Sequence, residues 1–314
     1  MDRNSTVLVT GGAGFIGGHL MRALRAKDVE VRVFDNLYRA DPVVVQEIRS
    51  TKGVTLVEGD VRYRAAVQRA MVGADYVVHL ASIAINKSVV DPEESVEVNM
   101  VGSDNVYAAA AEAGVRRLVF ASTASVYGDP DTLPMSEDGP LKPQTPYCIS
   151  KLASEHLLQF YGRTRGLDWN ILRFFNVYGP GQRTDAYYTT VILTFIERLL
   201  AGESPTIDGS GEQSMDFVHV RDIARAIVLA LESEQSKTIC NIGTGEQTSI
   251  ADLARLLIDA VGVDVEPKFR PRDVLVTRRA ADTRRAAEVL GFRPEVGVKE
   301  GLGEVVADVV AGRG

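Results

Sequence analysis

The sequence of 314 residues has few of the residues that define several classes of protein. It holds two cysteines, Cys148 and Cys240, too few for the disulfide framework of a small secreted domain. Histidine occurs four times, and histidine, cysteine and acidic residues nowhere recur at the spacing of metal ligands. We therefore expect reduced thiols and no metal site.

A long apolar run and an excess of basic residues are also lacking. No stretch approaches the ~20 consecutive apolar residues of a membrane-spanning helix. The first residues, MDRNSTVLVTGG, pass directly into a predicted strand and have no features of a signal peptide. The formal net charge of -7 indicates no basic surface for nucleic acid. We predict a cytoplasmic protein that binds neither membranes nor nucleic acid.

The first half of the sequence alternates short apolar runs with amphipathic stretches. Strand–helix alternation of this kind predicts an α/β fold with a Rossmann-type, doubly wound parallel sheet. The strands are predicted over residues 6–11, 30–36, 54–60, 74–82, 116–122 and 169–179, and the main helices over 15–27 and 95–114.

Beyond about residue 180 this alternation becomes less regular. A helix is predicted over 188–202, a segment rich in strands and turns over 204–220, and a helix over 221–233. We predict a dinucleotide-binding domain over 1–180 and a smaller, mainly substrate-binding lobe over 181–314. The two are expected to be interleaved, with some strands and helices of the second part returning to the main sheet.

Three glycines lie between the first predicted strand and its helix, at Gly11, Gly14 and Gly17. Glycines let the backbone approach a pyrophosphate, and the helix N-terminus offers free N–H groups with partial positive charge. The second strand ends at Asp35, where a carboxylate would bind the ribose hydroxyls and repel the additional phosphate of NADP. Arg39, the nearest following basic residue, lies four residues away. We therefore predict NAD, with ordinary turn glycines and a solvated aspartate as the alternative.

Further cofactor contacts are expected at the ends of the neighbouring strands. Asp60 closes the third strand, where an adenine-side contact and a plain turn or cap are both open. The residues predicted at the cofactor are Gly11, Gly14, Phe15, Ile16, Gly17, Asp35, Asn36, Asp60, Val61, Leu80, Ala81, Tyr147 and Lys151.

A tyrosine and a lysine four residues apart suggest acid–base chemistry. Tyr147 and Lys151 share one face of a predicted helix, which Pro146 suits as a start. An ammonium group one turn away favours the phenolate, so the tyrosine pKa falls towards the working pH. Thr123 and Ser125, in STASVYG, add hydroxyl groups at the end of a strand. Together these groups predict proton transfer at an alcohol, the partner of hydride transfer to NAD.

Several motifs along nearly the whole chain carry a resemblance to a known family. They are TGGAGFIG, HLAS, STASVYG, PYCISK, RFFNVYGPGQ, DFVHVRDIARA and NIGTG. The set resembles extended short-chain dehydrogenases/reductases of the NAD-dependent nucleotide-sugar epimerase/dehydratase family. The resemblance implies a Rossmann-type domain for NAD and a C-terminal lobe for a nucleotide-sugar, with a UDP-sugar expected. It also implies a homodimer through a helical bundle, with the helices around 95–113 and 147–165 as candidates.

The catalytic pattern of the family falls on Thr123, Tyr147 and Lys151. The resemblance implies that Tyr147 is the base that takes the proton of a sugar hydroxyl. Lys151 would hold the nicotinamide ribose and tune Tyr147, and Thr123 would hydrogen-bond the sugar oxygen.

Substrate contacts are also carried over from the resemblance. The diphosphate contact falls on Asn176, and Arg270 resembles a basic residue that meets the nucleotide phosphates. A turn residue and a solvated charge are the respective alternatives. Met215 replaces an arginine of many relatives, so another arginine would have to compensate. The predicted substrate contacts are Lys87, Asn176, Arg183 and Arg270.

Two small residues separate this sequence from relatives that make 4-keto-6-deoxy sugars. Those dehydratases carry an Asp-Glu pair after the threonine, where this chain has Ala124 and Ser125. An ordinary 4,6-dehydratase is therefore disfavoured. Cys148, beside the tyrosine, is either a small core residue or an additional acid or base. Ser125 and Cys148 are kept as catalytic candidates.

These observations predict an NAD-dependent enzyme that oxidises a UDP-hexose or UDP-N-acetylhexosamine transiently at C4 and returns the hydride. The expected net reaction is 4-epimerisation. The alternative is 5,6-dehydration of a UDP-hexosamine, the lyase reaction of the tunicamycin branch in antibiotic biosynthesis. A net oxidoreductase and a non-catalytic NAD-binding regulator are the further alternatives.

Overall fold

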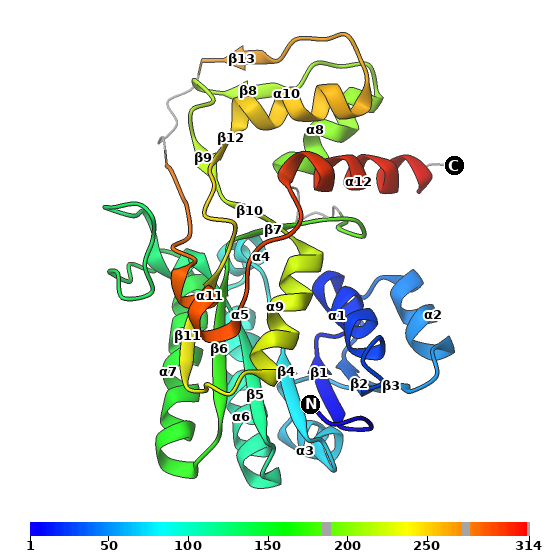
Figure 1. The fold of residues 1–314 in the computed structure, drawn as a ribbon, viewed down its shortest axis with the longest axis vertical. Coiled ribbons are helices and arrows are strands. Elements are labelled where there is room, and N and C mark those ends of the chain that lie inside the picture. The colour runs from blue at the N-terminus through cyan, green and yellow to red at the C-terminus, as the bar shows by residue number, and fades with distance from the viewer. Residues whose placement is uncertain (184–189, 272–276, 313–314) are drawn as a thin grey trace.

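The computed structural model describes residues 1–183, 190–271 and 277–312 (Figure 1). Its centre is a seven-stranded sheet in the order β11-β6-β5-β4-β1-β2-β3, in which all neighbours run parallel. The predicted α/β, doubly wound fold is confirmed. The strands are β1 (Thr6–Thr10), β2 (Glu30–Asp35), β3 (Val54–Glu58), β4 (Tyr76–His79), β5 (Arg117–Thr123), β6 (Trp169–Phe174) and β11 (Thr238–Ile242).

The strand order changes direction at β1, which pairs with β2 on one side and β4 on the other. Successive strand residues face opposite sides of the sheet. Accordingly, Val7 and Val9 enter one apolar core and Leu8 enters another. Ligands of doubly wound sheets bind beside the carboxyl ends of the strands at such a switch point.

Helices cover both faces of the sheet (Figure 1). On one face α6 packs against α3, α7 and the sheet, and on the other α1 packs against α9. The bounds of these helices and of the neighbouring α2 and α11 are α1 (Phe15–Arg25), α2 (Pro42–Ser50), α3 (Arg64–Met71), α6 (Gly102–Ala113), α7 (Pro146–Arg165), α9 (Val220–Glu232) and α11 (Arg284–Leu290).

A smaller lobe lies beyond the carboxyl ends of the strands, at the top of Figure 1. It has its own apolar core, built around Ile196, Leu253, Leu257 and Leu302. Its elements are α8 (Val191–Leu200), β8 (Thr206–Asp208), β9 (Ser214–Met215), β12 (Thr248–Ser249), α10 (Ile250–Val261), β13 (Lys268–Arg270) and α12 (Val298–Ala311). Because α9, β11 and α11 belong with the main sheet, the chain passes between the two parts several times. The boundary near residue 180 stays a prediction.

Two predicted elements are divided in the structure. The strand predicted over 169–179 ends at Phe174, and β7 (Asn176–Tyr178) pairs instead with β10 (Phe217–His219). The helix predicted over 95–114 contains a π-helical turn, η1 (Glu97–Val101), between α5 (Pro92–Val96) and α6. The first two residues of the helix predicted over 188–202 lie outside the described residues.

Within 1–183, 190–271 and 277–312, no helix is both long enough and apolar enough to cross a membrane.

Candidate active site

A cavity of about 310 Å³ opens at the carboxyl ends of the strands, beside the switch point between β1 and β4. Its walls come from the β1–α1 loop and from the ends of β2, β3 and β4. Every predicted cofactor residue except Tyr147 and Lys151 lines it. The lining residues that were predicted are Gly11, Gly14, Phe15, Ile16, Gly17, Asp35, Asn36, Asp60, Val61, Leu80 and Ala81.

The glycine loop has no room for side chains at two of its positions. Gly11 has φ +68°, and a Cβ atom there would lie 2.7 Å from the Ala81 amide nitrogen. A Cβ atom at Gly17 would lie 2.5 Å from the Cα atom of Gly12. Gly14 begins α1 and supplies no side-chain cap, so the first N–H groups of the helix remain for a ligand. This cradle fits the diphosphate of NAD.

Two carboxylates stand at the edge of this cavity. Asp35 accepts hydrogen bonds from the Ala13 amide at 3.0 Å and the Leu37 amide at 2.8 Å. Burial raises the pKa of Asp35 above its ordinary value. Asp60 accepts hydrogen bonds from the side chains of Arg62 and Asn36. Burial alone would raise the pKa of Asp60, but these hydrogen bonds and the charge of Arg62 outweigh burial, so the pKa is lowered.

The cavity also includes residues that the sequence analysis did not identify. They lie in the turn after β2, directly after β4, in α5 and after β7, and two of them, Ser82 and Gln182, belong to the motifs HLAS and RFFNVYGPGQ. Arg183, predicted as a substrate contact, also lines this cavity, with its guanidinium 3.3 Å from the carboxylate of Asp41. The additional lining residues include Tyr38, Arg39, Ala40, Asp41, Ser82, Ile83, Glu94 and Gln182.

The predicted catalytic residues come from the end of β5 and the start of α7. Thr123 is the last residue of β5, and its hydroxyl oxygen accepts a hydrogen bond from the Ser125 amide at 3.1 Å. Thr145 caps α7 and Pro146 occupies its first turn, as the sequence suggested. The backbone N–H of Tyr147 donates to the Ser88 hydroxyl at 3.2 Å. This contact fixes the entry of α7 against α4 (Ile85–Val90).

Lys151 is buried behind Tyr147. Its ammonium nitrogen donates to the Ala121 carbonyl at 2.9 Å and lies 4.9 Å from the Phe120 ring centroid and 6.0 Å from that of Tyr147. Burial lowers the pKa of Lys151 to about 7, against an opposing effect of Glu155. A charged lysine this close to a tyrosine ring favours the phenolate.

The two remaining catalytic candidates differ in their surroundings. Ser125 is half-buried in the short 3₁₀ turn η2 (Ala124–Tyr127) directly after Thr123. Cys148 is buried, and its thiol lies 3.0 Å from the Thr145 hydroxyl that also caps its backbone amide. This thiol therefore belongs to the cap of α7.

The other predicted substrate contacts lie on three separate elements. Asn176 donates from its side-chain amide to the Asp216 carbonyl at 3.1 Å. Arg270, on β13, pairs with Asp208 of β8 at 2.6 Å. Lys87, on α4, pairs with Asp91 and Glu94, whose carboxylates raise its pKa. The structure brings none of the three into contact with another.

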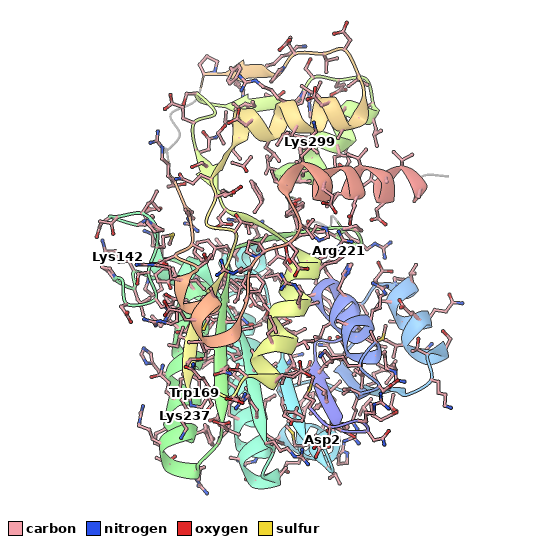
Figure 2. All side chains as sticks on the ribbon, viewed as in Figure 1. Asp2, Lys142, Trp169, Arg221, Lys237 and Lys299 are labelled. Carbon is pink, nitrogen blue, oxygen red and sulfur yellow. The ribbon has the colours of Figure 1, made fainter. Side chains whose placement is uncertain are left out.

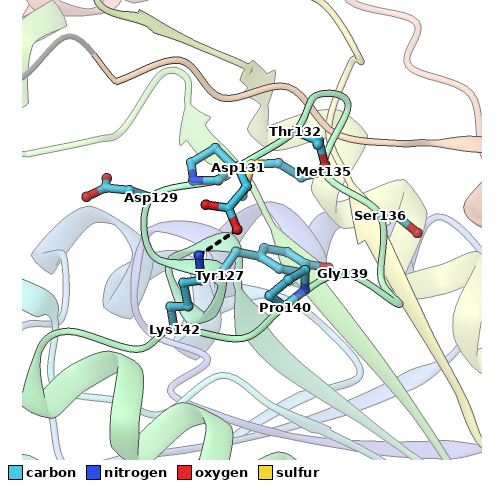
Figure 3. A pocket seen from close by; sticks show the side chains of 10 residues that line it. Tyr127, Asp129, Asp131, Thr132, Met135, Ser136, Gly139, Pro140 and Lys142 are labelled. Atoms are coloured by element: carbon cyan, nitrogen blue, oxygen red, sulfur yellow. Dashed lines mark hydrogen bonds and ion pairs between the residues drawn. The ribbon is translucent and has the colours of Figure 1, made fainter.

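A second hollow lies under the loop between Tyr127 and Lys142 (Figure 3). Its volume is about 30 Å³, room for roughly one water molecule. Lys142 and Asp131 close it with an ion pair of 2.6 Å. Nearby, Arg279 lies 4.0 Å from Asp129.

No group of three or more metal-binding side chains occurs in the described part of the chain.

Comparisons with known proteins agree with this geometry. Residues 7–243 match the model of the NAD dependent epimerase/dehydratase family. The UDP-glucose 4-epimerase of Mycolicibacterium smegmatis is 36% identical over 308 residues, which are 95% of this chain and 96% of the relative.

Solved structures of similar proteins extend over nearly the whole chain. The UDP-glucose 4-epimerase of Thermotoga maritima, solved with UDP-glucose, has a TM-score of 0.91 and 34% identity, covering 98% of this chain and 100% of that one. The Thermus thermophilus UDP-glucose 4-epimerase, solved with NAD, has a TM-score of 0.83 and 36% identity, covering 96% and 98%. The family is NAD-dependent, and its members are enzymes. The alternative of a non-catalytic regulator is therefore set aside. The chain belongs to the NAD dependent epimerase/dehydratase family of nucleotide-sugar enzymes.

Proposed function

We propose that this enzyme interconverts the C4 epimers of a UDP-hexose or UDP-N-acetylhexosamine. The observation that carries the proposal is the group formed by Thr123, Tyr147 and Lys151, followed by the small residues Ala124 and Ser125. The group supplies proton transfer at an alcohol. It offers no carboxylate pair after the threonine for the elimination of water.

Tyr147 takes the proton of the C4 hydroxyl when the sugar is oxidised, and returns a proton when the ketone is reduced. The ammonium form of Lys151 stabilises the phenolate between these steps. Thr123 donates its hydroxyl to the sugar oxygen. Bound NAD supplies the site that accepts the hydride from C4 and gives it back. Because no net redox change occurs, the same cofactor serves every turnover.

Reduction on the other face requires the keto sugar to rotate within the site. Ala124 and Ser125, the two residues after the threonine, place no bulky or charged side chain there. Cys148 has no part in the reaction, because its thiol is buried in the cap of α7 beside Thr145.

The partner of the enzyme is proposed to be a second copy of the chain. Exposed apolar side chains lie on adjoining parts of η1, α5 and α7, which contact one another. A two-helix face of this kind, covered in a homodimer, would form a four-helix bundle. The exposed residues are Val96, Met100, Val101, Ile149 and Phe160.

The test of the reaction is proton NMR of UDP-glucose and UDP-N-acetylglucosamine incubated with the enzyme. The proposal expects a new H4 coupling pattern with intact C6 methylene signals, and no product with Tyr147→Phe. Vinylic signals in place of the C6 methylene would instead establish 5,6-dehydration. No product from either sugar with the parent enzyme would contradict the proposed substrates.

A further inference from the structure

The carboxyl end of β5 is attached to α7 through consecutive residues. The Ala121 carbonyl accepts the hydrogen bond of Lys151, and the Ser122 hydroxyl donates to the Glu155 carboxylate at 2.5 Å. Lys151 and Glu155 are one helical turn apart, so they share a face of α7. The next residue along β5 is Thr123. The position of Thr123 relative to α7 is therefore set by these two bonds.

Glu155 is itself held from the neighbouring strand. Arg173, on β6, donates to its carboxylate at 3.0 Å through Nε and 2.7 Å through Nη2. The side chains of Arg173 and Glu155 are 2% and 1% exposed. Arg173 is also the register partner of Ser122 across the two strands. Side chains of two neighbouring strands thus donate hydrogen bonds to one carboxylate of α7.

Arg173 extends this arrangement to the turn after Thr123. Its Nη1 donates to the Tyr127 hydroxyl at 2.9 Å, and that hydroxyl donates to Asn241 of β11 at 2.7 Å. A buried ion pair is a costly means of stabilising a fold, because both charges lose their hydration. Such a pair does fix direction and distance, since a bidentate arginine–carboxylate contact has a defined geometry.

We propose that Glu155 is a positioning residue, which through Ser122 holds Thr123 in place against α7. Its negative charge also favours the ammonium form of Lys151. The inference rests on the proposed function, because the positioned groups are those of the proposed proton transfer.

The surroundings of Lys151 support the proposed effect of Glu155 on its ammonium form. The titratable and charged groups around it are His79 of β4, Tyr147 and Glu155 of α7, and Arg173 of β6, which is bonded to Glu155. Burial and the Lys151 charge lower the pKa of His79 to about 3, so His79 carries no charge at neutral pH. Burial lowers the pKa of Lys151 to about 7, and Glu155 is the group that opposes this fall. Loss of the carboxylate would lower the pKa of Lys151 further.

The first experiment measures the ionisation of Lys151 in the NAD-bound enzyme, without any sugar. The Cε resonance is followed by NMR during a pH titration, and its assignment comes from its absence in Lys151→Met. We expect the midpoint in Glu155→Gln to lie lower than in the parent by ~1 pH unit or more. The matched control is Asp168→Asn, which removes the 3.0 Å ion pair with Arg117 at the opposite end of β5. An unchanged midpoint in Glu155→Gln would overturn the electrostatic role.

The second experiment tests the geometric role with a variant that keeps the ion pair. Ser122→Ala removes only the hydroxyl group between Glu155 and β5. It therefore tests the positioning role even if Glu155→Gln does not fold. We expect kcat to fall about tenfold or more with KM unchanged, because misplaced catalytic groups slow the chemical step. Equal losses in Ser122→Ala and Asp168→Asn, or no loss in Ser122→Ala, would overturn the positioning role.

The two experiments separate this inference from the proposed function. The titration of Lys151 needs no substrate, so it reports on Glu155 even if neither UDP-sugar is converted. Failure of the parent enzyme to convert either sugar would contradict the proposed reaction and leave the titration result valid.

Discussion

The two ends of the central sheet use charge in different ways. At the amino end, near the labels of Asp2, Trp169 and Lys237 in Figure 2, ion pairs are partly or largely exposed to solvent. Arg116, for example, pairs there with Asp2, and their side chains are 53% and 76% exposed. At the carboxyl end, the charges of Lys151, Glu155 and Arg173 are almost completely buried.

The two sets of charges differ in what they contribute to stability. An exposed ion pair contributes ~0–1 kcal/mol, because water screens both partners. A buried charge costs several kcal/mol of hydration and persists only where other bonds hold it. The chain carries that cost at the carboxyl edge of the sheet, where the glycine loop follows β1 and Thr123 ends β5. We infer that stability at this edge is given up for chemistry.

The largest expected effect is that of Tyr147→Phe on turnover. Loss of the phenol removes the proton acceptor, so we expect the rate to fall by ~10³-fold or more. The change is confined to one hydroxyl group at a half-buried site, so the melting temperature and NAD affinity should change little. The measurements are kcat with UDP-glucose, thermal melting and NAD titration. Residual activity above one tenth of the parent would contradict a catalytic role for Tyr147.

Gly11→Ala should disturb the cofactor cradle and the fold together. The added methyl group would lie 2.7 Å from the Ala81 amide nitrogen, at a backbone φ of +68° that L-residues disfavour. We expect a loss of about 1–3 kcal/mol in the free energy of unfolding and markedly weaker NAD binding. Gly114→Ala is the matched control, because Gly114 also has positive φ but no neighbour within 4 Å. Unaltered NAD affinity in Gly11→Ala would show that the loop is not the diphosphate site.

Lys151→Met should stabilise the protein without NAD while it abolishes activity. Below pH 7 the ammonium is charged in both states, and the folded protein bears the full cost of its burial. Between pH 7 and about 10.5 the folded protein loses the proton first, so the stability of the parent rises with pH.

We therefore expect the variant to exceed the parent by about 2–4 kcal/mol at pH 6, with a smaller gap at pH 10. Denaturant unfolding at the two pH values measures this difference. A variant less stable than the parent at pH 6 would show that the buried ammonium is not a cost to the fold.

The smallest effect is expected at the amino end of the sheet. Arg116→Gln removes an exposed partner of Asp2 and Asp75, so the free energy of unfolding should change by less than ~1 kcal/mol. Denaturant unfolding and kcat measure this change, and kcat should equal that of the parent. A reduced kcat would contradict the proposal that charges at the amino end of the sheet have no part in the reaction.

Local patterns in the sequence were sufficient for much of the fold and for the cofactor side of the site. Gly11 and Asp35 were predicted because strand, loop and helix follow one another within a short stretch. The same holds for Tyr147 and Lys151, whose spacing alone places them on one face. Their arrangement into one site remains a prediction of function.

Features that depend on distant partners could not be predicted in this way. Glu155 and Arg173 are eighteen residues apart, and nothing in either local pattern shows that two strands and a helix bring them together. Arg183, predicted as a substrate contact, lines the cavity beside the glycine loop and pairs with Asp41, a neighbour that no local pattern indicates. The division of residues 169–179 into β6 and β7 likewise follows from pairing with β10.

The most direct test of the account follows a deuterium label placed at C4 of UDP-glucose. The account predicts that NMR finds the label at C4 of both epimers, with the C6 hydroxymethyl group intact and no release of reduced cofactor. Transfer of the label to C6, its appearance in free NADH, or a vinylic C6 would contradict 4-epimerisation.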